Sequence, residues 1–529
     1  MSAPLANPID PITLEVLRNA LEAVAQEMGA VLKLTAFSPN IKERMDASCA
    51  LFDQHAQLVA QAEHVPVHLG SMMRAVAPIL ARSGPLEQGD IVMVNDPFVA
   101  GAHLPDVTLL APVFIDGTCV AYVATRAHHS DVGGMEPGSM PGASRSIYQE
   151  GIILPPVKLY RAGVLQEDIQ AIFLRNVRTP EERRGDLNAQ LAALRVGIAR
   201  LEEVAERFGH ATLASGFAAI LDYSERRMRR RLAEMTPGVY EAEDFLDDDG
   251  SNTDPVRICV RATISPDRLV LDFEGSSPQC AGNVNAVAPM TQSASFFAVK
   301  LLIDATLPAN AGVLRLLDIR IPKGSFLDAQ APAAVCAGNT ETTQRVTDAV
   351  LRAFAQIAPD RIPAASQGTM NLVSIGGVDP RNGQSYTYIE TICGGQGGRP
   401  HGAGMDGVQV NMTNTMNTPI EALEISYPLR VECYELREGS GGEGRHRGGC
   451  GVIRSLRVIG HEARVSFQSD RRRFSPYGLH GGKDGAVGRN VKTDRDGNEQ
   501  VVGGKGSVTM KAEEVISIET PGGGGWGSH

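Results

Sequence analysis

Histidine and carboxylate side chains gather at two places in the first third of the sequence. His103 and Asp106 stand close together, and the segment His128-His129-Ser130-Asp131 follows them. Imidazole nitrogens and carboxylate oxygens are the ligands that zinc, manganese, iron and cobalt take from proteins. If the two segments meet, they form a site for one divalent cation, and Asp96 is a further carboxylate nearby. The competing interpretation is that these residues only cap strand ends through hydrogen bonds.

A predicted β-hairpin brings the two segments together. The runs 107–115 and 118–125 are apolar and β-branched, and Asp116-Gly117 between them is the strongest short-range hairpin signal. Residues equally distant from the turn lie opposite each other in an antiparallel pair. The open end of the hairpin therefore places the loop of His103 and Asp106 beside the histidine pair.

The hairpin register decides which histidine faces Asp106. Neighbouring strand residues point to opposite faces, so only one of His128 and His129 can share a face with Asp106 while the strand continues. A strict two-residue turn pairs Asp106 with residue 127 and places His129 on its face. A bulge or a longer loop places His128 there instead. The spacing leaves both alternatives open.

Two charged segments and one glycine-rich segment are weaker candidates. Glu43-Arg44-x-Asp46 and Glu63-His64-x-x-x-His68 interrupt otherwise apolar sequence, which is typical of a buried ion-pair network or of a substrate pocket. The segment Gly394-Gly395-Gln396-Gly397-Gly398-Arg399 predicts either a flexible turn or a loop whose N–H groups wrap an anion. No G-x-x-x-x-G-K-[ST] phosphate loop occurs in the sequence.

The remaining patterns predict a multi-domain α+β chain. Apolar spacing of three and four residues predicts a helix from Pro11 to about Thr35, with Asp10 as its N-cap and proline at the first helical position. Helical patterns recur at 185–234, with a break near Gly209, at 293–304 and at 342–357. Strand-like runs dominate the last hundred residues. We expect an N-terminal metal-site domain (1–184), a helical segment (185–235), a central α+β domain (236–425) and a glycine-rich β domain (426–529).

Composition excludes several classes of partner. Fifty Lys and Arg against 61 Asp and Glu give a net charge of −11, which opposes binding to a phosphate backbone. No run is apolar and long enough to span a membrane, and the first residues lack the pattern of a signal peptide. Eight scattered cysteines without a C-x-x-C pair predict reduced thiols. These features predict a cytoplasmic protein that binds neither nucleic acid nor membranes.

An ordered series of motifs along essentially the whole chain resembles the B subunit of the hydantoinase/oxoprolinase family. Several long motifs in the same order are far more specific than any single one. The motifs are Ile41-Lys-Glu-Arg44, Pro66-Val-His-Leu-Gly-Ser-Met72, Asn95-Asp-Pro-Phe98, Gly101-Ala-His-Leu-Pro-Asp106, His128-His-Ser-Asp-Val-Gly-Gly134, Pro137-Gly-Ser-Met140, Gly185-Asp-Leu187, Gly338-Asn-Thr-Glu341, Tyr427-Pro-Leu-Arg430, Arg445-His-Arg-Gly-Gly449 and Thr520-Pro-Gly-Gly-Gly-Gly-Trp-Gly527.

The resemblance implies ATP-dependent opening of a cyclic amide such as a hydantoin, 5-oxoproline or a related lactam. It also implies an A-type ATPase partner that binds ATP and Mg in place of this chain, in a hetero-oligomer with two or more copies of each subunit. By similarity to the acetone carboxylase relative, the metal ligands are His103, Asp106 and His128. The alternatives are a subunit of an acetone or acetophenone carboxylase and a non-catalytic scaffold for the ATPase.

A bound cation activates water in the mechanism that the resemblance suggests. The partner phosphorylates the carbonyl oxygen, and water then attacks the activated carbon at the metal site. Asp131 or His129 is expected to act as general base or to orient a ligand, and Glu43 is a third candidate catalytic residue. Two histidines and one carboxylate also describe the facial triad of non-haem iron oxygenases, which the whole-length resemblance disfavours.

Overall fold

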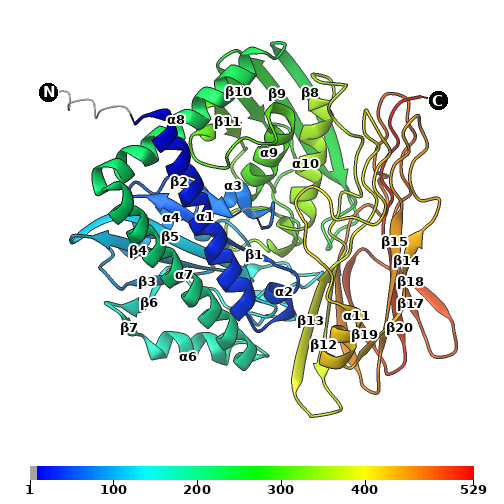
Figure 1. Ribbon diagram of the computed structural model, residues 1–529. Coiled ribbons are helices and arrows are strands. Elements are labelled where there is room, and N and C mark those ends of the chain that lie inside the picture. The colour runs from blue at the N-terminus through cyan, green and yellow to red at the C-terminus, as the bar shows by residue number, and fades with distance from the viewer. Residues whose placement is uncertain (1–8, 63, 529) are drawn as a thin grey trace.

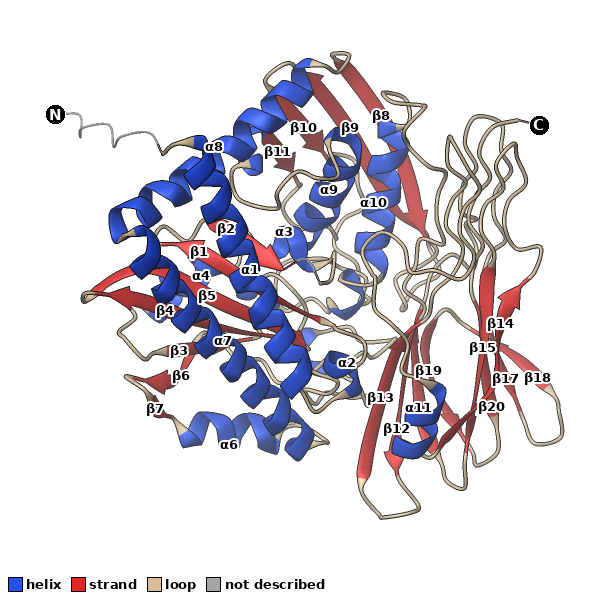
Figure 2. Cartoon of the chain, in the orientation of Figure 1, coloured by secondary structure: helices blue, strands red, loops and turns tan. Residues whose placement is uncertain are grey.

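The computed structural model describes residues 9–62 and 64–528. The N-terminal stretch used above against a signal peptide therefore lies outside the described residues, as does Glu63. Helices and four separate β-sheets alternate along the chain, which confirms the α+β prediction (Figures 1 and 2). None of the described helices combines the length and the apolar character needed to cross a bilayer.

The first sheet contains the predicted hairpin at its centre. Its strand order is β2-β1-β5-β4-β3-β6-β7, and every neighbouring pair is antiparallel. The hairpin strands are fully or largely buried near their open ends, because the sheet is covered by helices. The bounds are β1 Ala47–Asp53, β2 Leu58–Ala62, β3 Ile91–Val94, β4 Asp106–Ile115, β5 Thr118–His128, β6 Val157–Arg161 and β7 Val164–Leu165.

Two long helices lie side by side across this sheet (Figure 1). Helix α1 (Pro11–Thr35) begins where the Asp10 carboxylate accepts the N–H groups of Ile12 and Thr13, as the sequence predicts for an N-cap followed by proline. Helix α7 (Pro180–Phe208) ends at Gly209, whose φ of 85° breaks the helical path before α8 (His210–Ala233). The predicted break is confirmed. The shorter helices here are α2 Pro39–Lys42, α3 His68–Met72, α4 Val76–Ser83, α5 Pro97–Ala100 and α6 Glu167–Arg175.

A second sheet, in the order β11-β10-β9-β8, packs with two buried helices. Helix α10 (Glu341–Phe354) is buried along nearly its whole length although it carries Arg345 and Asp348. Helix α9 (Ala288–Ile303) packs beside α10. The strands are β8 Gly238–Leu246, β9 Val256–Ser265, β10 Arg268–Asp272 and β11 Leu317–Arg320.

Two further sheets form the C-terminal part, which lies to the right in Figure 1. One has the order β13-β12-β16-β19, so the hairpin of β12 and β13 shares a sheet with strands from beyond residue 425. The other has the order β14-β15-β20-β17-β18. The bounds are β12 Leu372–Val378, β13 Ser385–Thr391, helix α11 Ile420–Ser426, β14 Leu429–Arg437, β15 Gly451–Val458, β16 Ala463–Gln468, β17 Arg489–Thr493, β18 Glu499–Val502, β19 Lys505–Met510 and β20 Val515–Glu519.

The segment 394–399 packs against other glycine-rich loops. Its backbone N–H groups donate to oxygens of Val408, Pro521, Met405, Ser366, Gly524 and Gly402. A Cβ atom at Gly395 would lie 2.0 Å from the Gly449 carbonyl oxygen, so only glycine allows this approach. Because its N–H groups are already used, the segment is neither an anion-wrapping loop nor a flexible turn.

Candidate metal centre

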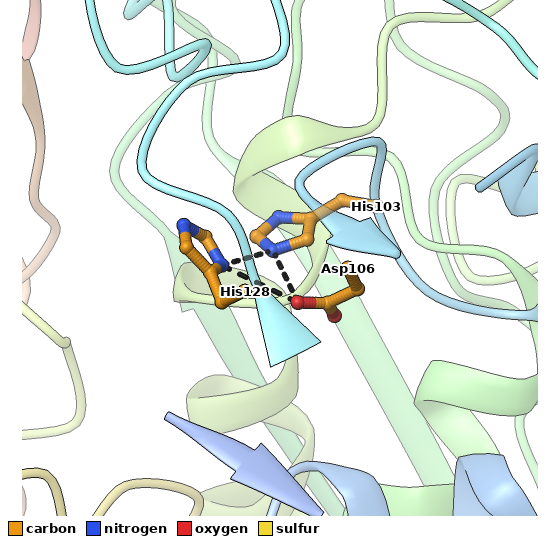
Figure 3. A group of neighbouring side chains, drawn as sticks. All are labelled: His103, Asp106 and His128. Carbon is orange, nitrogen blue, oxygen red and sulfur yellow. Dashed lines mark hydrogen bonds and ion pairs between the residues drawn. The ribbon is translucent and has the colours of Figure 1, made fainter. Parts of the chain in front are cut away.

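The open end of the β4–β5 hairpin gathers three of the predicted side chains (Figure 3). His103 lies in the loop before β4, Asp106 begins β4 and His128 ends β5. A register shift at Val113 and Phe114, near the turn, pairs Asp106 with His128 and not with residue 127. Of the two registers that the sequence left open, the structure therefore has the one with a bulge, which places His128 opposite Asp106.

The three ligand atoms are spaced as ligands of one ion would be. His103 Nε2 lies 3.0 Å from His128 Nδ1, and Asp106 Oδ1 lies 3.4 and 3.3 Å from these two nitrogens. Ligand atoms about 2.1 Å from a common ion in tetrahedral or octahedral geometry stand about 3.0–3.4 Å apart. The spacing therefore fits a single divalent cation.

Neighbouring groups fix the orientation of the Asp106 carboxylate. Its Oδ2 atom accepts a hydrogen bond of 3.0 Å from Asn339 Nδ2 and lies 3.4 Å from His68 Nε2. Its buried Oδ1 atom has no hydrogen-bond partner among the described residues. We call His68, His103, Asp106 and His128 the histidine cluster. Oδ1 is thus the oxygen left for a cation.

The tautomer of His103 follows from its second nitrogen. His103 Nδ1 lies 3.0 Å from the Cys336 carbonyl oxygen, which can only accept a hydrogen bond. Nδ1 therefore carries a proton, and in the neutral ring, which is the form that binds a metal, the Nε2 lone pair faces Asp106 and His128. A protein carbonyl on the far nitrogen is the usual arrangement for a metal-bound imidazole.

Burial and charge act in opposite directions within the histidine cluster. Burial alone would raise the pKa of Asp106, but the charges available on His103 and His68 hold that pKa well below its usual range. Burial acts to lower the pKa of His103, yet Asp106 and the Cys336 carbonyl raise it overall. The carboxylate is therefore ionised in the absence of a metal, as a ligand must be.

A small cavity opens beside the histidine cluster. Its volume is about 30 Å³, and one buried water needs about 10–15 Å³. Arg44 and Asp46 line it together with the cluster, and Val65, Val67, Met370, Leu372 and Ile389 supply apolar wall. By this measure the space holds about two or three waters, so a lactam ring needs the lining side chains to move.

The structure places the three predicted catalytic residues outside this cavity. His129 follows the end of β5 and points toward α7, where its Nε2 lies 2.9 Å from Gln190 Oε1. Asp131 forms an ion pair of 2.8 Å with Arg178 and accepts backbone N–H groups. Glu43 is half-buried at the end of α2. Burial next to a charged arginine lowers the pKa of His129 to about 4.

The site also contains residues to which the sequence analysis gave no specific role. His68 starts α3, with its Nδ1 3.0 Å from Ser48 Oγ, and Asp46 Oδ2 lies 4.0 Å from His128 Nδ1. Both belong to the charged segments in apolar sequence, so that signal marked a pocket. Asp96, in contrast, caps α5 by accepting the Phe98 N–H. Asn339 lies far along the chain, in the motif Gly338-Asn-Thr-Glu341, and nothing in the sequence linked that motif to the hairpin.

Comparisons with known proteins agree along the whole chain. A family described as hydantoinase B/oxoprolinase matches residues 10–529. An uncharacterized protein of Methanocaldococcus jannaschii is 40% identical, over 98% of this chain and 91% of its own. A protein of Arabidopsis thaliana named 5-oxoprolinase 1 is 39% identical over 99% of this chain, which spans 42% of that relative's length.

Solved structures share the fold. An ATP-dependent caprolactamase from Pseudomonas jessenii aligns with a TM-score of 0.93 and 30% identity, over 99% of this chain and 92% of that one. A nucleotide-free acetone carboxylase aligns with a TM-score of 0.91 and 18% identity, over 98% of this chain and 76% of that one. At that identity the second likeness concerns the fold alone.

Proposed function

The chain belongs to the hydantoinase B/oxoprolinase family, and from this we propose that it opens a cyclic amide together with an ATPase partner subunit. The relatives named 5-oxoprolinase and caprolactamase act on lactams, and the caprolactamase is ATP-dependent. The substrate class proposed is a lactam or hydantoin. ATP and Mg are bound by the partner in this proposal.

The histidine cluster is the observation that carries the proposal. Three buried ligand atoms converge within hydrogen-bonding distances, and Asp106 Oδ1 lacks a partner among the described residues. Such a donor set fits a divalent cation of the Zn, Mn, Fe or Co type. When bound, that cation lowers the pKa of water from 15.7 toward about 7 and supplies a nucleophile at neutral pH.

The reaction needs an activated carbonyl and a base. Phosphorylation of the amide oxygen by the partner makes the ring carbon electrophilic. Water adds to that carbon, the ring carbon–nitrogen bond breaks with a proton passing to nitrogen, and a second water releases phosphate from the acyl phosphate. Asp46 lines the cavity, whereas Asp131 is occupied by Arg178, so we assign Asp46 as the general base.

The first prediction concerns His103 and Asp106. The chain co-expressed with its partner is expected to hold stoichiometric metal and to open 5-oxoproline, a hydantoin or caprolactam with ATP cleavage. His103→Ala and Asp106→Ala should lose the metal and slow ring opening about a thousandfold, because metal activation contributes several kcal/mol. Metal analysis and turnover measure the two effects.

His129→Gln is the matched control for this experiment. His129 is as buried as the ligands but bonds Gln190 on the other side of β5, so this variant should keep the metal. Unchanged metal content and turnover in Asp106→Ala would refute the proposal. Bicarbonate consumption coupled to ATP cleavage would instead support a carboxylase subunit.

A further inference from the structure

Arg44 is a buried cation in the wall of the cavity beside the histidine cluster. Its side chain is 2% exposed. Nη1 donates to Asn40 Oδ1 at 2.8 Å and to the Ile389 carbonyl at 2.6 Å, and Nη2 donates to Thr391 Oγ1 at 2.8 Å and Thr415 Oγ1 at 3.5 Å. All four acceptors are neutral. Arg44 forms no ion pair among the described residues, so no carboxylate contacts its guanidinium group directly.

The fifth N–H group of Arg44 has no acceptor. Its Nε atom is buried and lacks a hydrogen-bond partner among the described residues. An unmet buried donor is unfavourable, and Arg183, Arg345, Arg471 and Arg472 share this feature. Of these five arginines, only Arg44 lines the cavity. Because Arg44 lines the cavity, an oxygen atom of a ligand there would complete its hydrogen bonds and balance its charge.

Three threonine hydroxyls extend the polar wall around Arg44. Thr391 Oγ1 lies 2.6 Å from Thr415 Oγ1, and Thr413 Oγ1 lies 3.3 Å from Thr415 Oγ1. All three residues line the cavity. Hydroxyl groups rotate to donate to an incoming acceptor. A guanidinium with adjacent hydroxyls is a donor set that suits an oxyanion better than a cation or a neutral group.

Asn40 links this donor set to the histidine cluster. Its Oδ1 accepts from Arg44, and its Nδ2 donates to the His128 carbonyl at 2.8 Å. The carboxylates of Asp46 and Asp106 lie with the histidines. The cavity therefore has a cation-binding side and an anion-binding side in one space.

We propose that Arg44, Thr391 and Thr415 form a subsite for a small oxyanion, the carboxylate or the phosphoryl group of the substrate, next to the histidine cluster. The identity of that ligand rests on the proposed function. The subsite would hold the reacting molecule by its negative group. It would thereby keep the activated carbon close to the cluster.

Arg126 is a buried arginine that, unlike Arg44, lies outside the cavity wall. It too is fully buried and bonds only neutral acceptors, namely Thr108 Oγ1, Ser71 Oγ and the Ala100 carbonyl. Its Nε atom, however, donates to Thr108, and Arg126 is not among the residues lining the cavity. Arg126 is therefore a matched control for the loss of a buried positive charge.

Titration of metal-free full-length protein with orthophosphate tests the subsite. Isothermal calorimetry on the wild type should detect binding, and Arg44→Gln should weaken it about ten- to hundredfold, as expected for a lost charged hydrogen bond. Arg44→Lys should give an intermediate affinity, and Thr415→Val should weaken binding about fivefold. Arg126→Gln should bind as the wild type does. Thermal melting establishes that each variant is folded.

Competition identifies the source of the oxyanion. 5-Oxoproline and 2-pyrrolidinone differ only in the carboxylate. If that carboxylate occupies the subsite, only 5-oxoproline displaces orthophosphate; if a phosphoryl group does, neither lactam displaces it. Either result supports the subsite.

Two results would overturn the subsite. One is a wild type that binds neither orthophosphate nor 5-oxoproline, and the other is Arg44→Gln binding as tightly as the wild type. Neither result depends on the metal, because the titration uses metal-free protein. A wild type that holds no metal would refute the proposed function, while the titration would still decide the role of Arg44.

Discussion

Two buried polar regions of this chain are built on opposite principles. The histidine cluster turns ring nitrogens and a carboxylate oxygen toward one another around a cavity. The second region, which we call the arginine–aspartate network, pairs each carboxylate with a cation. It comprises Asp244, Arg345, Asp348, Asp470, Arg471 and Lys505.

The network balances its charges without any ligand, although the Nε atoms of Arg345 and Arg471 lack hydrogen-bond partners among the described residues. Asp470 receives Arg345 at 2.9 Å and Lys505 at 2.7 Å, while Arg471 contacts Asp348 at 2.7 Å and Asp244 at 2.9 Å. Its three cations and three anions come from strand β8, helix α10, the loop that follows β16, and strand β19. The network thus joins distant parts of the chain, whereas the histidine cluster leaves Asp106 Oδ1 without a hydrogen-bond partner among the described residues. Burial of charge alone does not mark a functional site.

The largest effect that tests this contrast is the removal of Asp470. Asp470→Ala removes the nearest carboxylate from both cations and leaves Arg345 only Asp244 at 3.6 Å and Lys505 only Asp248 at 3.3 Å, which should lower the free energy of unfolding by about 3 kcal/mol. Asp106→Ala removes a carboxylate that no buried arginine or lysine pairs with among the described residues, so metal-free protein should lose only about 1–2 kcal/mol. Denaturant unfolding of both variants measures the difference.

Metal addition should separate the two variants in the opposite way, because only Asp106→Ala should lose the stabilisation that a bound cation gives. A cation at a concentration of about 100 times its Kd should stabilise the wild type by about 3 kcal/mol and leave Asp106→Ala unchanged. Asp470→Ala should keep the gain, because Asp470 does not line the cavity. Equal stability losses in the two metal-free variants would contradict the distinction between the regions.

A second prediction uses pH at the edge of the network. Glu341, at the start of α10, is fully buried and has no ion pair among the described residues. Burial, reinforced by the charge of Asp470, raises the pKa of Glu341 to about 7. The folded state therefore holds a proton that the unfolded state releases near pH 4.5, so stability falls as the pH rises from 4.5 to 7.

Glu341→Gln should remove this loss, which amounts to about 3 kcal/mol. The Oε1 atom accepts the Met370 N–H, and glutamine retains that acceptor. Denaturant unfolding at pH 5 and pH 8 should show a large difference for the wild type and a smaller one for the variant. Parallel profiles for the two proteins would show that Glu341 is ionised in the fold.

Local patterns accounted for much of the fold and for half of the site. The Asp116-Gly117 turn, the N-cap at Asp10 and the break at Gly209 were readable because each depends on neighbouring residues. The convergence of His103 and Asp106 with a histidine followed from the same hairpin. The choice of His128 did not, because a bulge depends on how the strands pack.

Local sequence patterns could not predict contacts between segments that lie far apart in the chain. His68, at the start of α3, contacts Asp106, and its other ring nitrogen bonds Ser48 of β1. Asn339 and Cys336 come from a short 3-10 helix and the turn that follows it, far along the chain. The arginine–aspartate network gave no sequence signal at all. Its charges lie in helical and strand patterns where exposed residues are the ordinary expectation, and only tertiary packing buries them.

The smallest expected effect concerns how the histidine cluster is held. The buried Glu150 carboxylate accepts the backbone N–H groups of Val335 and Cys336, and the Cys336 carbonyl in turn fixes His103 Nδ1. Glu150→Gln should weaken these bonds, loosen His103 and reduce metal affinity about tenfold, as is typical for groups one step behind a ligand. Ser144→Ala, which removes a hydroxyl bonded to Glu150, should have a weaker effect of the same kind.

The measurement is a competitive metal titration against a chromophoric chelator, with unfolding in parallel. A role in positioning His103 predicts that metal affinity falls more than metal-free stability does, and that Glu150→Asp restores part of the affinity. If Glu150→Gln lowered metal-free stability while metal affinity stayed unchanged, Glu150 would belong with the arginine–aspartate network as a purely structural group. In that case His103 would belong to the metal site, whereas Glu150, which lies behind it, would only stabilise the fold.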